Sequence, residues 1–213
     1  MNQSMKYYTN IASLLLILSI IASCGGSNLG LSPPPKDPVG AQQLINQAWA
    51  KYEKAQYQNA INLFIEAREK DSALLDIYNG LGWSYFKTHK LILSLSNFSI
   101  AIGADSSFTD AMVGYSIAAF EKNEYDQAIR VFNTIARIDS AEFNIRGTDE
   151  YVFSHDSSVT SRKVRKIIAL CYYYSGRFME SFYQLKNFLD PFTKVDTSSE
   201  TFLTDLFTAL EKI

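Results

Sequence analysis

The stretch KDSALLDIYNGLGWSYF, residues 70–86, carries two glycines inside a segment whose apolar spacing predicts an amphipathic helix. A glycine inside a helix lowers helix stability by roughly 1 kcal/mol relative to alanine, so it indicates a position with no room for a side chain. We assign this role to Gly82, which we expect to lie where two helices approach closely. The pattern gives no comparable reason for Gly80.

Features of this stretch recur at intervals of 34 residues along the chain. Asp-Ser pairs begin at residues 71, 105 and 139. Two further columns keep the same interval, one of small residues and one of aromatic residues: Ala60, Ser94 and Ala128, and Phe64, Phe98 and Phe132. Three columns in one register predict a tandem array of helical units.

A 34-residue period with these residues resembles the tetratricopeptide repeat, whose units are pairs of helices. In residues 75–108 the characteristic positions of that family are taken by Tyr78, Leu81, Gly82, Tyr85, Leu91, Ser94, Phe98 and Ala101. The resemblance covers about residues 41–193. It implies an all-α right-handed superhelix, an alpha-alpha solenoid, in which Gly82 faces Ser94, Ala48 faces Ala60 and Ser116 faces Ala128.

The predicted array of residues 41–213 is interrupted once. Repeats occupy about residues 41–74, 75–108, 109–142 and 162–195, and an insert of residues 143–161 separates the third from the fourth. The insert contains EYVFSH, residues 150–155, whose alternation predicts a short extended arm.

Residues 199–213 have apolar side chains at helical spacing, and we expect them to form a capping helix over the end of the array. A helix lying on a membrane surface is the alternative. The basic residues that would flank such a helix are nearly absent.

The amino-terminal segment predicts export from the cytoplasm. Residues 1–23 have a lysine followed by an apolar run, as in a signal peptide. The stretch IASC, residues 21–24, resembles the lipobox of bacterial lipoproteins. The resemblance implies that Cys24 carries lipid and that the protein is anchored in the cell envelope, at the outer membrane and facing the periplasm, because no aspartate follows the cysteine.

Residues 24–40 are rich in Gly, Pro and Ser, which predicts a tether between the lipidated cysteine and the array. Two alternatives to a lipid anchor remain. One is an ordinary signal peptide with a chance cysteine, and the other is a plain membrane anchor.

Composition narrows the classes of function. The chain has 213 residues, a net charge of −2 and no long basic block, so we expect no nucleic-acid partner. His89 and His155 lie outside any metal-binding spacing, and no glycine-rich phosphate loop occurs. We therefore expect no enzyme, no metal and no cofactor. We expect Cys171 to be a small buried side chain, and His155, which precedes Asp156, to be a solvated loop residue rather than a general base.

The resemblance also implies a concave groove lined by the first helix of each repeat. Carried over by position, it gives these candidate residues of a peptide-binding groove: Trp49, Tyr52, Asn79, Trp83, Phe86, Ile117, Phe120, Lys163, Lys166, Leu170 and Tyr173. An exposed stripe of rings is typical of a docking site. The alternative is that some of these rings belong to the core. Lys163 and Lys166 lie with Arg162 and Arg165 in the first turns of a helix, a pattern typical of an acidic ligand or of a solvated basic face.

These features predict a membrane-anchored adaptor that binds a protein or peptide segment in its groove, in the assembly of an envelope complex. The alternative is an architectural subunit that uses its outer faces and its insert without a peptide groove. An accessory of a hydrolase or transferase is a third hypothesis, which lacks a set of catalytic residues.

Overall fold

The structure is a computed structural model that describes residues 36–138, 151–186 and 195–212. The residues from Asp37 onward belong to one compact unit. Cys24, the predicted signal peptide, most of the predicted tether and the first part of the insert lie outside the described residues. In the described ranges no helix is long and apolar enough to cross a membrane.

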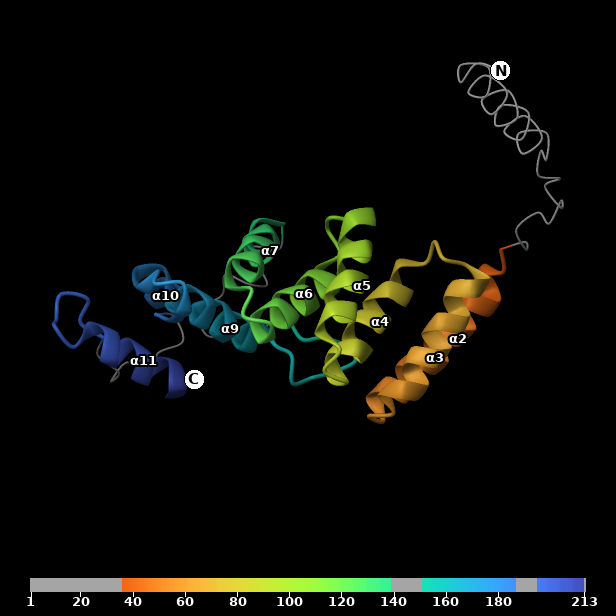
Figure 1. The fold of residues 1–213 in the computed structure, drawn as a ribbon, viewed down its shortest axis with the longest axis horizontal. Helices are drawn as coiled ribbons and strands as arrows, with labels where there is room; N and C mark the ends of the chain where they lie inside the picture. Colours follow the sequence, from red (N-terminus) through yellow and green to blue (C-terminus); the bar gives the residue numbers. More distant parts are fainter. Residues whose placement is uncertain (1–35, 139–150, 187–194, 213) are drawn as a thin grey trace, which may run out of the picture. The chain divides into compact units, whose positions relative to one another are not determined.

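Helices account for most of the described chain, and Figure 1 shows them in order. They are α2 (Pro38–Glu53), α3 (Tyr57–Lys70), α4 (Leu75–Lys87), α5 (Leu91–Ala104), α6 (Thr109–Glu121), α7 (Tyr125–Ile138), α9 (Ser161–Tyr174), α10 (Phe178–Leu185) and α11 (Phe202–Lys212). The helix α2 begins at Pro38 because the Asp37 side chain accepts a hydrogen bond from the Gly40 amide at 2.8 Å and caps the first turn.

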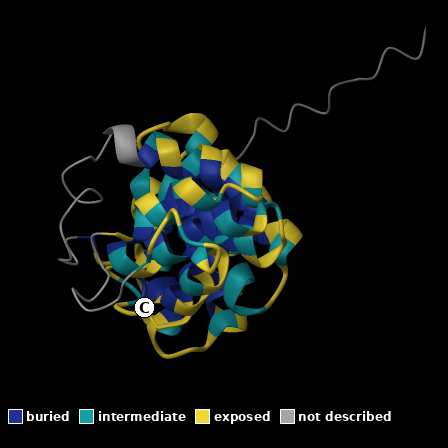
Figure 2. Cartoon of the chain, turned by 90° about the vertical axis from the view of Figure 1, so that its left-hand side faces the viewer, coloured by how far each residue is buried: buried dark blue, intermediate teal, exposed yellow. Residues whose placement is uncertain are grey.

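The helices pack as consecutive antiparallel pairs. Contacts join α2 to α3, α4 to α5, α6 to α7 and α9 to α10, and the first helices of successive pairs also touch one another. The last helix, α11, packs on α9 and α10, where Leu206, Ala209 and Leu210 are buried. This arrangement confirms an all-α array of helix pairs closed by a carboxy-terminal helix. The buried side chains gather between the helices (Figure 2).

Each pair turns through one residue with left-handed backbone. These residues are Ala55 (φ 56°), His89 (φ 56°), Asn123 (φ 64°) and Gly176 (φ 72°). The first three are 34 residues apart and the fourth follows after 53, so the turn keeps its place in every pair. In each turn the amide after the left-handed residue donates to a carbonyl five residues earlier, as Gln56 does to Lys51 at 2.9 Å.

The small residues inside the pairs allow the predicted close approach. The Ser94 hydroxyl donates to the Gly82 carbonyl at 2.8 Å, and the Ser181 hydroxyl donates to the Ala169 carbonyl at 2.7 Å. Both serines are fully buried. The contact predicted between Gly82 and Ser94 is therefore confirmed, and a hydrogen bond between the two helices adds to it.

A second small position lies between neighbouring pairs and accounts for Gly80. A β-carbon at Gly80 would lie 2.0 Å from the ring of Phe64, and one at Gly114 would lie 2.3 Å from the ring of Phe98. Gly80 and Gly114 are 34 residues apart, as are the two phenylalanines. The ring that ends one pair thus packs directly on the backbone that begins the next.

Candidate functional site

Residues 151–160 of the insert fold into a closed loop, which we call the insert loop. The Phe153 amide donates to the Val159 carbonyl and the Ser161 amide to the Tyr151 carbonyl, both at 2.9 Å. An isolated antiparallel bridge joins Val152 to Thr160. Side chains alternate as in a strand: Tyr151 and Phe153 are buried and Val152 is 46% exposed.

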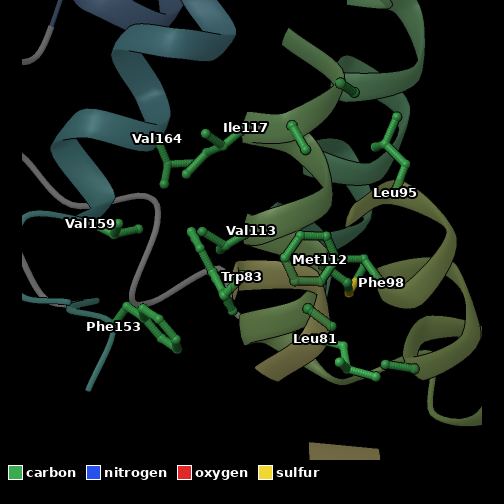
Figure 3. Close-up of a cluster of buried hydrophobic side chains, with 14 of the residues drawn as sticks. Leu81, Trp83, Leu95, Phe98, Met112, Val113, Ile117, Phe153, Val159 and Val164 are labelled. Atoms are coloured by element: carbon green, nitrogen blue, oxygen red, sulfur yellow. The ribbon is translucent and has the colours of Figure 1, made fainter. Parts of the chain in front are cut away.

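The buried side of the insert loop packs on both tryptophans of the chain. The Phe153 ring stacks on Trp83 with centroids 4.5 Å apart and meets Trp49 edge-on at 5.9 Å. The His155 ring stacks on Trp49 with centroids 3.8 Å apart. Figure 3 shows Phe153 directed at Trp83, with Val159 and Val164 nearby. The insert loop therefore covers the first helices of the first two pairs.

Polar contacts hold the edges of the insert loop to three helices. On α2, Glu53 lies 2.8 Å from Nδ1 of His155. On α4, Lys87 forms an ion pair with Asp156 at 2.6 Å. On α6, Asp110 accepts a hydrogen bond from the Tyr151 hydroxyl at 2.6 Å. The apolar contacts and these three polar contacts together bind the loop along the row of first helices.

Beyond the insert loop, a pocket of about 490 Å³ opens between α6 and α9. Three apolar side chains, Phe120, Ile167 and Leu170, and the Thr160 hydroxyl line it. Its charged lining consists of Arg162, Lys163, Lys166 and Glu121. Within the described ranges, the amino groups of Lys163 and Lys166 form no ion pair. The pocket is thus partly apolar and carries a net positive charge.

No protein-family model and no curated protein matches the chain. Solved structures of helical-repeat proteins do match it. YrrB, a tetratricopeptide-repeat protein with an unusual peptide-binding site, is 15% identical with a TM-score of 0.57, and the match covers 83% of this chain and 77% of YrrB. MamA is 17% identical with a TM-score of 0.57, covering 71% and 72%. A thermophilic repeat protein of Thermus thermophilus, TTC0263, is 15% identical with a TM-score of 0.53, covering 80% and 82%.

The chain has the tetratricopeptide-repeat fold. In this fold the row of first helices forms the surface from which the candidate groove residues were assigned. The structure places the candidates in two groups. One group lies under the insert loop, and the other lies around the open pocket or near α11.

The prediction of an exposed stripe of rings is wrong for the first group. Within the tetratricopeptide-repeat array, the residues of this group are buried: Trp49, Tyr52, Asn79, Trp83 and Ile117. The insert loop supplies the cover for the two tryptophans, so these rings follow the alternative in which they belong to the core. Inside this covered region, the Tyr52 hydroxyl, the Asn79 amide oxygen and the Trp83 ring nitrogen have no hydrogen-bond partner among the described residues.

The second group remains accessible to different degrees. Phe120, Lys163, Lys166 and Leu170 come together in the open pocket. Phe86 is half-buried beside Trp83, with ring centroids 6.1 Å apart. Tyr173 lies apart from the pocket, against Phe178 and Phe207.

Three further predictions concern single residues. The prediction that His155 is a solvated loop residue is wrong, because its ring stacks on Trp49. Cys171 is buried as expected, and burial raises the pKa of its thiol to about 12. Arg165 does not join the other cations of its helix at the pocket. It is buried and donates to the Gln184 side chain at 3.0 Å.

The carboxyl groups under the insert loop differ in electrostatics. Burial raises the pKa of Asp110, and the hydrogen bond from Tyr151 offsets only part of this effect. Burial also acts to raise the pKa of Asp156, but the hydrogen bonds from Lys87 and Ser158 outweigh it and lower the pKa. Asp156 therefore stabilises the fold above its unfolded pKa and loses this contribution as pH falls through the folded value. Asp110 has the opposite sign, because its ionised form is the one that burial disfavours.

Proposed function

We propose that this protein is a non-catalytic adaptor that binds an acidic, partly apolar segment of a partner protein in the open pocket between α6 and α9. The observation that carries the proposal is the lining of that pocket. Its apolar side chains lie beside two lysines that have no ionic partner in the described part of the chain. A peptide with carboxylates and one apolar side chain fits this chemistry.

The surroundings of the pocket support binding there rather than further along the row of first helices. The insert loop covers Trp49 and Trp83, while Phe120 and Leu170 remain accessible. Lys163 and Lys166 lie one turn apart on α9 and are rigidly placed by the helix. YrrB, which has the same fold, is described as having a peptide-binding site, which is compatible with this use of the fold.

The peptide proposal is tested with Lys163→Glu/Lys166→Glu. The probe is an array of synthetic peptides that combine several acidic residues with a leucine or phenylalanine, against neutral peptides of the same apolar content. We expect the double variant to lose at least about tenfold in affinity for acidic peptides, because attraction becomes repulsion at both sites. We also expect binding by the unchanged chain to weaken as salt is raised.

The matched control is Lys51→Glu/Lys54→Glu on α2. It changes the net charge equally, uses the same three-residue spacing and lies away from the pocket. Equal binding by the two double variants, or equal binding of acidic and neutral peptides, would contradict the proposal. Circular dichroism of both variants checks that the helices are retained.

The membrane tether is a separate part of the proposal and is supported by the sequence around Cys24 alone. The lipidated cysteine and the Gly, Pro and Ser-rich segment place the adaptor in the bacterial cell envelope, at the outer membrane and facing the periplasm. We expect Cys24→Ser to move the protein from the membrane fraction to the soluble fraction, because it removes the site of acylation. A Cys24→Ser chain that stays with the membrane after an alkaline carbonate wash would refute lipid anchoring at this residue.

A second candidate function is an architectural subunit within a larger assembly. One observation favours it: the outer face of α5 exposes Ile92, Leu93 and Ile100. An adaptor and an architectural subunit differ in which surface matters, the pocket or this outer face.

A further inference from the structure

The outer face of α5 differs from the same face of the neighbouring second helices. Ile92 is 72% exposed, Ile100 is 46% and Leu93 is 45%. The remaining exposed positions of this face are occupied by Ser96, Ser99 and Gly103. From Leu91 to Ala104 the helix has no charged residue. Patches of this kind on a soluble domain are typical of an interaction surface.

The repeats provide an internal comparison for this face. Thirty-four residues earlier, on α3, the positions of Ile92, Leu93, Ser96, Ile100 and Gly103 are taken by polar residues: Gln58, Asn59, Asn62, Glu66 and Glu69. Thirty-four residues later, on α7, the first four of these positions hold Asp126, Gln127, Arg130 and Thr134. The apolar face is therefore particular to α5 and is not a requirement of the repeat.

Gly103 gives a second, independent observation. A β-carbon at Gly103 would meet no atom within 4 Å, whereas one at Gly80, Gly82 or Gly114 would meet a phenylalanine ring. Glycine lowers helix stability relative to alanine, and no contact among the described residues requires it here. A close approach by another molecule supplies the missing reason, since glycine lets a partner reach the helix backbone.

We propose that the outer face of α5 is a self-association surface on which α5 of a second copy of this chain packs antiparallel about a two-fold axis. The charges at its two ends support a second copy as the occupant. Lys90 precedes the helix and Asp105 follows it, and both are exposed. In an antiparallel pair of identical helices, each Lys90 lies opposite Asp105 of the second copy, so both ends form attractive pairs.

The same register brings the other residues of the face together. With the axis at the level of residues 97 and 98, Lys90 meets Asp105 and Ser96 meets Ser99 of the second copy. Ile92 then meets Gly103, so a projecting side chain faces a position without one. A face without charge also brings no like charges together across the axis. The face is about 21 Å long for its 14 residues. This length makes an interface smaller than that of standard stable dimers, so we expect weak association that confinement to a membrane would strengthen.

The register is tested by cysteine cross-linking in cells that express the full chain. Ser96→Cys and Ser99→Cys chains with different tags are co-expressed, and disulfide-linked heterodimers are detected on non-reducing gels. The control pair, Arg130→Cys with Asn133→Cys, occupies the same repeat positions on α7. We expect at least about tenfold more heterodimer from the α5 pair. Comparable yields from both pairs, no heterodimer, a cross-link within one chain or a cross-link to a different protein would each overturn the proposal.

The association itself is tested with Gly103→Arg. Arginine is a better helix former than glycine and has open space at this position, so we expect thermal stability to be kept or raised. Sedimentation of the full chain over a concentration series into the high micromolar range should show self-association at least about tenfold weaker than without the substitution. The control is Glu69→Arg, the equivalent position on α3. Association that is unchanged by Gly103→Arg, or is absent from the unsubstituted chain, would overturn the proposal.

Discussion

Alanine in place of Phe153 is expected to lower the free energy of unfolding by about 3–5 kcal/mol. The Phe153 ring is 1% exposed and lies between the insert loop and both tryptophans. Without the ring, a cavity opens between Trp49 and Trp83, and the loop loses its main apolar contact. Urea unfolding followed by circular dichroism measures the loss.

Tryptophan emission gives a local measurement of the same change. The chain has two tryptophans, and both contact Phe153. We therefore expect Phe153→Ala to shift the emission to longer wavelength as water reaches their rings. The control is Val152→Ala on the same loop, where the side chain is exposed and the change should stay within about 0.5 kcal/mol. Unaltered emission together with unaltered stability in Phe153→Ala would show that the loop does not cover the tryptophans.

Gly80→Ala is the second substitution with a large expected effect, a loss of about 2 kcal/mol in the free energy of unfolding. Its β-carbon would lie 2.0 Å from the Phe64 ring, which is fully buried and has no free space to move into. Overpacking costs up to about 3 kcal/mol, and the higher helix propensity of alanine offsets about 1 kcal/mol of it.

Gly103→Ala separates packing from helix propensity. The substitution is chemically identical, but the new β-carbon meets nothing within 4 Å, so we expect a gain of about 1 kcal/mol. Phe64→Leu in the Gly80→Ala background should recover part of the loss, because the two residues share one contact. Effects of the same sign for the two alanine substitutions would contradict the role assigned to Phe64.

The repeat columns in the sequence were sufficient to predict the helix pairs. Small residues and phenylalanines at a fixed interval specify how the two helices of a pair meet, and the contact of Gly82 with Ser94 followed from them. The role of Gly80 did not follow, because its partner Phe64 belongs to the preceding pair. A column of glycines, Gly80 and Gly114, was present in the same register as the phenylalanines and is the signal that identifies this contact.

The position of the insert loop was not predictable from the period. Alternating side chains from Tyr151 to Phe153 indicated an extended segment with one apolar side, but not the surface that this side covers. Its contacts reach far along the chain: Glu53 and His155 are 102 residues apart. No periodic pattern encodes such a pairing, so the burial of Trp49 and Trp83 could be stated only as an alternative. Phe120, Lys163, Lys166 and Leu170 were identified from repeat position alone, because the fold repeats its groove geometry with each pair.

The insert loop also changes how the array should gain and lose its structure. In a solenoid with contacts only between adjacent units, a terminal unit can open while the others stay folded. Here the loop that leads into α9 contacts α2, α4 and α6, so the first pair shares an interface with a segment next to the fourth. Fraying from the amino-terminal end must therefore break contacts formed by the distant end of the chain. This long-range closure makes the four pairs a single cooperative unit, whose formation waits for the slow meeting of segments about 100 residues apart.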